Sequence, residues 1–217
     1  HAQHVHRVPA QPGLAVPEHG QRRRPRIRPA QQPAALRLRA EHAERAVVGK
    51  PWNETTAEAA AREALSQARA RNDDGGRDAL VVALSVMAQI DQDAGRLDVA
   101  TQRYAQAAEV CRRPPVSPRL PHVLRHLGML QLRAKNLLAA ISCCEEAVKI
   151  RRGQPDTPTL EMANTLRPLA LIREAEGRKL DAVALWQEAA SLYATAGVDS
   201  GVEESLSRLA ALTTRDP

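Results

Sequence analysis

The chain has 217 residues and a formal net charge of +6, and only 2% of its residues are aromatic, with no phenylalanine. This composition disfavours a β-sheet core, in which aromatic and β-branched residues concentrate, and favours helices packed through leucine and alanine. No apolar run approaches the about 18 residues needed to cross a membrane, and the three cysteines lack the spacing of a zinc or redox motif.

The first 46 residues are rich in proline, glutamine, arginine and histidine and show no lasting hydrophobic period. Such a segment cannot bury enough apolar surface to offset the entropy lost on folding, so we predict that residues 1–46 form a disordered tail. The positive charge belongs to this tail, because residues 1–40 contain eight arginines and a single glutamate. The rest of the chain is therefore nearly neutral.

From residue 54 onward, small and large apolar residues recur at spacings typical of paired helices. Helix axes normally lie about 8–10 Å apart and approach more closely only where small side chains face each other. Three pairs of small residues have the same separation of twelve positions: Ala88 and Ala100, Gly128 and Ala140, and Ala170 and Ala182. After each second member comes a large residue or cysteine and then another alanine: Tyr104 and Ala107, Cys144 and Ala147, Trp186 and Ala189.

This pattern resembles the helix hairpins of the tetratricopeptide repeat (TPR) family. Equivalent positions of successive repeats, such as Ala88, Gly128 and Ala170, lie 40 and then 42 residues apart, which is longer than the usual TPR period of about 34. The additional residues fall in proline-containing loops between the hairpins, so the chain is similar to the long-period repeats of kinesin light chains. The resemblance implies an all-α fold, a right-handed superhelical solenoid of antiparallel helix hairpins.

We predict that this array occupies residues 54–217. Its members are a partial repeat at 54–71, full repeats at 77–112, 117–152 and 157–196, and a capping helix at 201–214. A terminal helix is needed to cover the last apolar face of a solenoid. In the capping helix we expect Leu206, Leu209 and Ala210 to face the array, because they repeat the spacing found in the third repeat.

The third repeat contains a proline within an otherwise helical pattern. Pro168 cannot donate the backbone hydrogen bond to the carbonyl of Asn164, so we expect a kink near Asn164. Two interpretations are open: the kink shapes a binding groove, or it is a tolerated bend in an already curved array.

No pattern of catalytic residues is present. The sequence contains no glycine-rich phosphate loop, GxSxG or HExxH motif. Ser142, Cys143, His122 and His126 could supply a nucleophile and a base, but they fall on different predicted helices and lack a third group to orient them. We therefore expect a protein that is not an enzyme and that binds no metal or cofactor.

The TPR resemblance implies that a partner peptide lies along the first helices of the hairpins. Matching the repeats gives the expected groove residues, which are Ser85, Gln89, His122, Arg125, His126, Met129, Asn164, Arg167 and Leu171. The Lys/Asn set of the TPRs that clamp chaperone carboxylates is not reproduced, so a chaperone C-terminus is not the expected ligand.

Arg125 and Arg167 occupy equivalent positions in neighbouring repeats. Two arginines on one concave wall favour an acidic peptide, because a guanidinium can hold a carboxylate through two parallel hydrogen bonds. The alternative is that both arginines pair with acids on adjacent helices, such as Glu161 or Glu174, and contribute only to solubility. Both alternatives are open at this point.

The leading functional hypothesis is a non-catalytic scaffold or adaptor for protein partners, either free or as the regulatory part of a longer protein. The alternative is binding of nucleic acid or another polyanion through the arginine-rich tail, which would weaken steeply with salt. The chain lacks an initiator methionine and an apolar signal segment. We therefore expect a fragment or processed product located in the cytoplasm.

Overall fold

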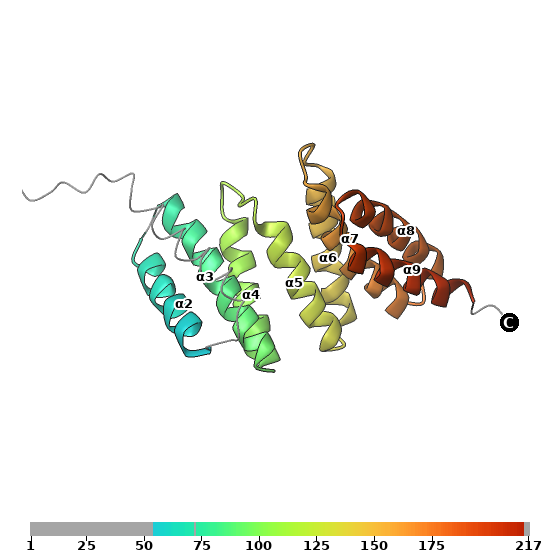
Figure 1. The fold of residues 1–217 in the computed structure, drawn as a ribbon. Helices are drawn as coiled ribbons and strands as arrows, with labels where there is room; N and C mark the ends of the chain where they lie inside the picture. Colours follow the sequence, from blue (N-terminus) through green and yellow to red (C-terminus); the bar gives the residue numbers. More distant parts are fainter. Residues whose placement is uncertain (1–53, 72, 215–217) are drawn as a thin grey trace, which may run out of the picture.

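The computed structural model describes residues 54–71 and 73–214, and this part of the chain forms eight α-helices and no β-strand. The helices are α2 (Glu54–Arg69), α3 (Asp74–Asp93), α4 (Leu97–Arg112), α5 (Leu120–Arg133), α6 (Leu137–Arg152), α7 (Thr159–Ala175), α8 (Lys179–Thr195) and α9 (Asp199–Thr213). Figure 1 shows them following one another along an elongated array. The predicted all-α solenoid of helix hairpins is confirmed, while the tail predicted at residues 1–46 lies outside the described residues.

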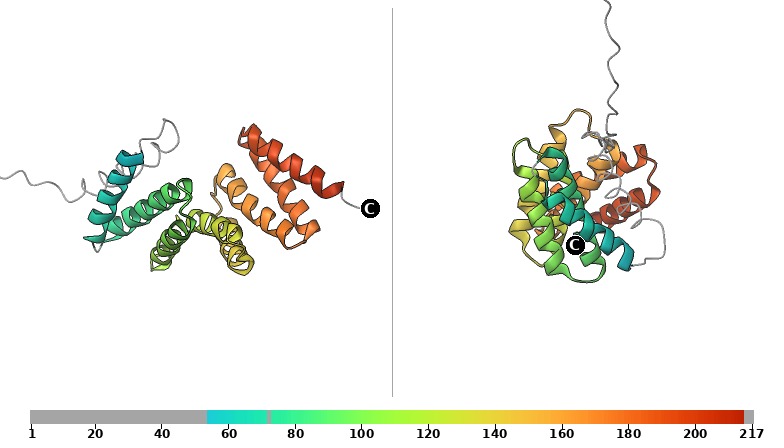
Figure 2. Two further views of the ribbon diagram at one scale, coloured as in Figure 1. Left: turned by 90° about the horizontal axis from the view of Figure 1, so that it is seen from below. Right: turned by 90° about the vertical axis from the view of Figure 1, so that its left-hand side faces the viewer.

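The hairpins pair consecutive helices: α3 packs on α4, α5 on α6, and α7 on α8. Neighbouring hairpins are joined by contacts of α4 with α5 and of α6 with α7, and α5 also touches α7. Seen from below in Figure 2, the array bends into an arc, with α5 on the inner side of the bend and α4 and α6 on the outer side. The first helix of the central hairpin therefore faces the concave side.

Small residues make the contact between the helices of each hairpin, as their spacing predicts. Gly128 of α5 packs directly against Cys144 and Ala140 of α6. Ala140 is fully buried, as are Ala100 and Ala182 at the equivalent positions of the other hairpins. The predicted close approach of the paired helices is confirmed at this contact.

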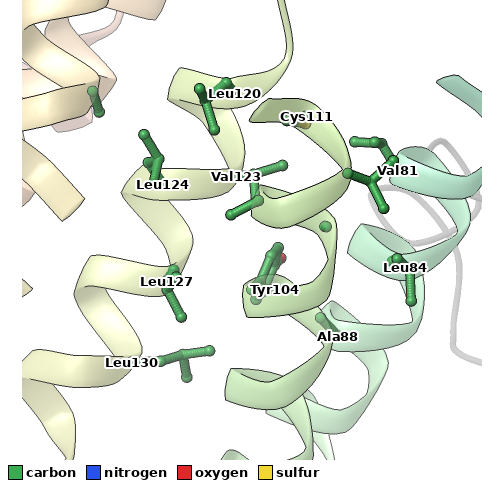
Figure 3. Packing of buried hydrophobic residues seen from close by; sticks show 14 of the residues in the cluster. Val81, Leu84, Ala88, Tyr104, Cys111, Leu120, Val123, Leu124, Leu127 and Leu130 are labelled. Atoms are coloured by element: carbon green, nitrogen blue, oxygen red, sulfur yellow. The ribbon is translucent and has the colours of Figure 1, made fainter. Parts of the chain in front are cut away.

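Apolar side chains form a continuous core across the boundary between hairpins. Figure 3 shows Tyr104 of α4 between side chains of α3, such as Leu84, and side chains of α5, such as Val123 and Leu127. Tyr104 is 1% exposed and Trp186 at the equivalent position of α8 is fully buried. Each repeat thus completes its core with residues of the next one, as expected for a solenoid.

The turns inside the three hairpins have the same backbone structure. The second residue after the first helix adopts a positive φ of 75° at Gly95, 60° at Lys135 and 75° at Gly177. In each turn, the following residue donates its backbone N–H to the carbonyl five positions earlier. This arrangement ends one helix and reverses the chain, and in the central hairpin a lysine adopts the conformation that glycine adopts in the other two.

Two ion pairs connect successive outer helices at equivalent positions. Arg112 Nη2 of α4 lies 2.7 Å from Glu146 Oε2 of α6. One repeat later, Arg152 Nη2 of α6 lies 2.6 Å from Glu188 Oε2 of α8. These outer-helix bridges join neighbouring repeats through exposed side chains, whereas the core joins them through buried ones.

The register predicted for the last helix is wrong. Leu206 of α9 is 55% exposed and Ala210 is also exposed, and of the three predicted contact residues only Leu209 packs against the array. Gly201 and Ser205 are buried instead, and Gly201 lies directly against the tyrosine ring near the end of α8.

The physical reason is the length of the linker that precedes α9. Residues 196–198 alone join α8 to α9, whereas residues 113–119 and 153–158 join the earlier hairpins. Because this linker is shorter, α9 contacts α8 through residues that lie nearer to the N-terminus of α9. The small side chains of Gly201 and Ser205 then take the contact positions.

Candidate functional site

The inner helices α5 and α7 present most of the predicted groove residues. From α5 these are His122, Arg125, His126 and Met129, and from α7 they are Asn164, Arg167 and Leu171; all seven are half-buried. α5 and α7 are in contact, so these residues of the second and third repeats lie on neighbouring helices.

Arg125 contacts two histidines of its own helix. Its Nη2 lies 3.2 Å from His122 Nδ1 and 3.2 Å from His126 Nε2. Since arginine can only donate hydrogen bonds, both ring nitrogens must act as acceptors, which requires neutral imidazoles. The Nε atom of Arg125 is buried and has no hydrogen-bond partner. In the described part of the chain, no carboxylate lies within ion-pair distance of Arg125.

Burial explains why both histidines remain neutral. It lowers the pKa of His122 to about 4, with a further contribution from the positive charges of Arg125, Arg119 and Arg151. Burial also lowers the pKa of His126 well below its ordinary value, assisted by His122 and Arg125. The pKa of Arg125 is itself lowered by burial, although the carboxylate of Glu161 opposes this effect.

An aromatic contact fixes the orientation of His126. Its ring stacks on Tyr104 of α4, with ring centroids 5.2 Å apart and an angle of 7° between the planes. The ring of His122 lies 4.7 Å from that of His126 in a tilted arrangement. The sequence identified Tyr104 as a core residue but did not predict this contact, because it joins two different repeats.

Arg167 is paired, in contrast to Arg125. Its Nε and Nη2 atoms donate to the two carboxylate oxygens of Glu204 in α9, at 2.6 and 2.7 Å. This hydrogen bonding lowers the pKa of Glu204 below its ordinary value. Arg167 therefore has an acidic partner on an adjacent helix. That partner is Glu204, whereas Glu161 and Glu174 bond to other groups.

The predicted groove residues of α3 are engaged within their own helix. Ser85 is 7% exposed, and its hydroxyl donates to the carbonyl oxygen of Val81 at 2.8 Å. Gln89 is half-buried and donates to Asp93 Oδ1 at 2.8 Å. The polar groups of Ser85 and Gln89 thus form hydrogen bonds within α3.

On α7, Asn164 Oδ1 accepts a hydrogen bond of 2.9 Å from the hydroxyl of Tyr193 in α8. The helix continues through Pro168, so the chain is not broken there, and the bend predicted near Asn164 stays a prediction. Met129 of α5 and Leu171 of α7 are half-buried apolar side chains.

The described residues contain no group of three or more His, Cys, Asp or Glu side chains arranged to hold a metal ion. None of the helices in this part of the chain combines the length and the apolar character needed to span a membrane.

No protein-family model matches the sequence, and no curated protein matches it. Solved structures do match. BtubC (BKLC) from P. vanneervenii is 17% identical, with a TM-score of 0.58 over 85% of this chain and 91% of that one. A putative kinesin light chain of Podosopora anserina with nearly identical TPR-like repeats is also 17% identical, with a TM-score of 0.57 over 85% of this chain and 99% of that one. The chain has the TPR-like repeat fold.

The TPR-like assignment concerns the fold alone at this level of identity. It confirms the resemblance to long-period repeats that the sequence indicated. Within the TPR-like array, the cluster of Arg125, His122 and His126 lies on the first helix of the central hairpin, which is the helix on the inside of the arc (Figure 2).

Proposed function

We propose that this protein is a non-catalytic scaffold that binds a segment of a partner protein along the inner face of α5 and α7. The observation that carries this proposal is the environment of Arg125, a half-buried cation that contacts two neutral histidines and has no carboxylate of the described residues within ion-pair distance. The TPR-like fold supports a role in protein interaction, because such arrays offer an extended concave surface.

Burial of the Arg125 charge has a free-energy cost. A cation removed from water is costly unless an opposite charge compensates it. Arg167, Arg151 and Arg173 each have a carboxylate partner in the folded chain. Arg125 lacks one among the described residues, and an acidic side chain of a ligand would supply it.

The ligand that fits this surface is an acidic peptide with apolar residues. Its carboxylate would accept hydrogen bonds from the guanidinium of Arg125, which are stronger than hydrogen bonds between neutral groups. Its apolar side chains would contact Met129 and Leu171, which are half-buried on the same surface. The protein would act as an adaptor, either free or as part of a longer chain.

The test is selection of a random peptide library displayed on phage against the full chain, in parallel with Arg125→Gln. We expect peptides enriched in aspartate or glutamate beside apolar residues, and we expect this enrichment to disappear with Arg125→Gln. The matched control is Arg133→Gln, which removes an exposed arginine from the last turn of the same helix. Identical acidic peptides selected by the parent and by Arg125→Gln would contradict the proposal.

A further inference from the structure

Both hydrogens on the Nη2 atom of Arg125 are already used within the folded chain. This atom carries two hydrogens, and it lies 3.2 Å from His122 Nδ1 and 3.2 Å from His126 Nε2. Each imidazole therefore accepts one of them. The Nε–H group lies beside Nη2 on the same edge of the guanidinium, and it is buried with no hydrogen-bond partner in the described part of the chain.

A carboxylate cannot bind Arg125 through two parallel hydrogen bonds without displacing a histidine. Such a contact uses Nη2 together with either Nε or Nη1, because these pairs of N–H groups point in parallel directions. Arg167 shows the first arrangement in this protein, since its Nε and Nη2 atoms hold both oxygens of Glu204. On Arg125, the same contact would satisfy the partnerless Nε–H group and would take one Nη2 hydrogen away from a histidine.

His122 is held less firmly than His126 and is therefore the histidine to be displaced. The ring of His126 is stacked on Tyr104 of α4, with an angle of 7° between the planes, so packing as well as a hydrogen bond fixes its position. Among the described residues, the ring of His122 has one hydrogen bond, to Arg125, and a tilted contact with the ring of His126.

We propose that a ligand carboxylate at Arg125 displaces His122, which then takes up a proton from solution, so that the ligand binds more tightly as the pH falls. This inference rests on the peptide-binding function proposed for α5 and α7. The displaced imidazole no longer accepts a hydrogen bond from a cation, and a carboxylate beside it favours its charged form. The protonated ring donates to the carboxylate, so Arg125 and His122 hold the ligand together.

The charges around His122 explain why its ring is neutral when no ligand is bound. Burial lowers its pKa to about 4, and three arginines add to this effect. Arg119 and Arg151 each bond to a carboxylate of the chain, whereas Arg125 has none of the described residues' carboxylates within ion-pair distance. The titratable and charged side chains that act on the cluster are Tyr104 of α4, Arg119 before α5, Arg125 and the two histidines of α5, Arg151 of α6, Glu161 of α7 and Tyr193 of α8.

The direction of the pH effect follows from the pKa of His122 in the two states. In the free protein this pKa is about 4, and a carboxylate beside the ring raises it. Between the free and the raised value, the complex holds a proton that the free protein lacks, so the proton and the ligand promote each other's binding. The affinity should therefore rise as the pH decreases from about 7, by up to about ten-fold for each pH unit.

The test uses the full chain and the synthetic peptide acetyl-Leu-Glu-Ser-Leu-Glu-Ser-amide, titrated by NMR at about pH 7 and about pH 5.5. The glutamates of the peptide remain mostly ionised at both values, because their ordinary pKa is about 4.3. We expect the peptide to bind about ten-fold more tightly at the lower pH, and the ring nitrogens of His122 to titrate at a higher pH in the complex. The control peptide with glutamine in place of glutamate should bind more weakly and without this pH dependence.

Two variants identify the histidine that takes up the proton. His122→Gln keeps an acceptor for Arg125 but cannot be protonated, so its affinity for the acidic peptide should change little with pH. His126→Gln should retain the pH dependence of the parent. The titration of the His122 ring in the parent protein gives the same information without relying on either variant.

The outcomes separate this inference from the proposed function. Equal affinity for the acidic peptide at both pH values would overturn the inference and leave the peptide-binding function standing. The same holds if His126→Gln abolishes the pH dependence and His122→Gln preserves it. Equal affinities for the glutamate and glutamine peptides, or no binding of either, would contradict both proposals.

Discussion

A Cβ atom placed on Gly128 of α5 would lie 2.3 Å from Sγ of Cys144 in α6. The thiol is fully buried, and the carbonyl oxygen of Ala140 lies 3.4 Å from the same point. The equivalent residues of the other hairpins, Ala88 and Ala170, carry a methyl group. The two helices of the central hairpin therefore meet at a position where only glycine fits without rearrangement.

We predict that Gly128→Ala destabilises the protein. Overpacking a core typically costs about 1–3 kcal/mol, which exceeds the gain of up to about 1 kcal/mol from the higher helix propensity of alanine. Urea denaturation measures the difference in unfolding free energy. The matched control is Gly153→Ala, because a Cβ atom there makes only ordinary contacts of 3.5 Å.

Adding Cys144→Ala to Gly128→Ala removes the Sγ atom that the new methyl group would meet. The double variant should recover part of the stability lost by Gly128→Ala, so the two substitutions should not be additive. Strict additivity would show that the methyl group does not encounter Cys144.

Lys135→Gly should stabilise the protein. Lys135 has a φ of 60° in a turn where the other two hairpins have glycine, and this left-handed conformation costs a non-glycine residue about 1 kcal/mol. We expect a gain of about 0.5–1 kcal/mol, measured as a higher midpoint in thermal or urea unfolding. The reverse change, Gly95→Lys, should cost a similar amount, since a Cβ atom on Gly95 meets no other atom within 4 Å. A destabilised Lys135→Gly variant would contradict the argument.

Stability should fall as the pH decreases from about 6.5 towards about 4. The pKa of His122 is about 4 in the folded chain, below the ordinary value of 6.5, and that of His126 is also lowered. Between these values the unfolded chain binds more protons than the folded one, so lowering the pH favours unfolding.

Urea titrations at about pH 7 and about pH 5 measure this effect, because between these values the histidines of the unfolded chain bind protons that those of the folded chain do not. His122→Gln removes one of the titrating groups and should reduce the loss of stability between the two conditions. An unchanged pH dependence in this variant would show that His122 does not titrate abnormally.

The ion pair between Arg167 and Glu204 should couple α7 to α9. Both side chains are about one-third exposed, at 37% and 30%, so a double-mutant cycle with glutamine at each position should give a modest coupling of about 0.5–1 kcal/mol. The coupling should decrease with added salt, because salt screens partly exposed charges. A coupling of zero at low salt would show that this ion pair does not help to hold α9 on α7.

Helix pairing could be predicted from the sequence because it depends on local spacing. Gly128 and Ala140 are twelve positions apart within one hairpin, and the close approach of two helices requires small residues at such positions. The register of α9 could not be predicted in this way. It depends on the short linker at 196–198, which shifts Gly201 and Ser205 into contact with α8.

The candidate site was only partly predictable for a related reason. Arg125 and Arg167 are equivalent in sequence, but their neighbours come from other helices. Arg167 meets Glu204 of α9, whereas His126 beside Arg125 stacks on Tyr104 of α4. These differences arise from packing between repeats, which the spacing inside a single repeat does not specify.

The outer-helix bridges have a mechanical consequence. Arg112 with Glu146 and Arg152 with Glu188 join successive repeats on the surface, and exposed ion pairs of this kind resist deformation only weakly. The buried core around Tyr104 holds each pair of repeats together much more firmly. The spacing and tilt of neighbouring repeats are therefore determined mainly by the buried core, and the outer-helix bridges add little to them.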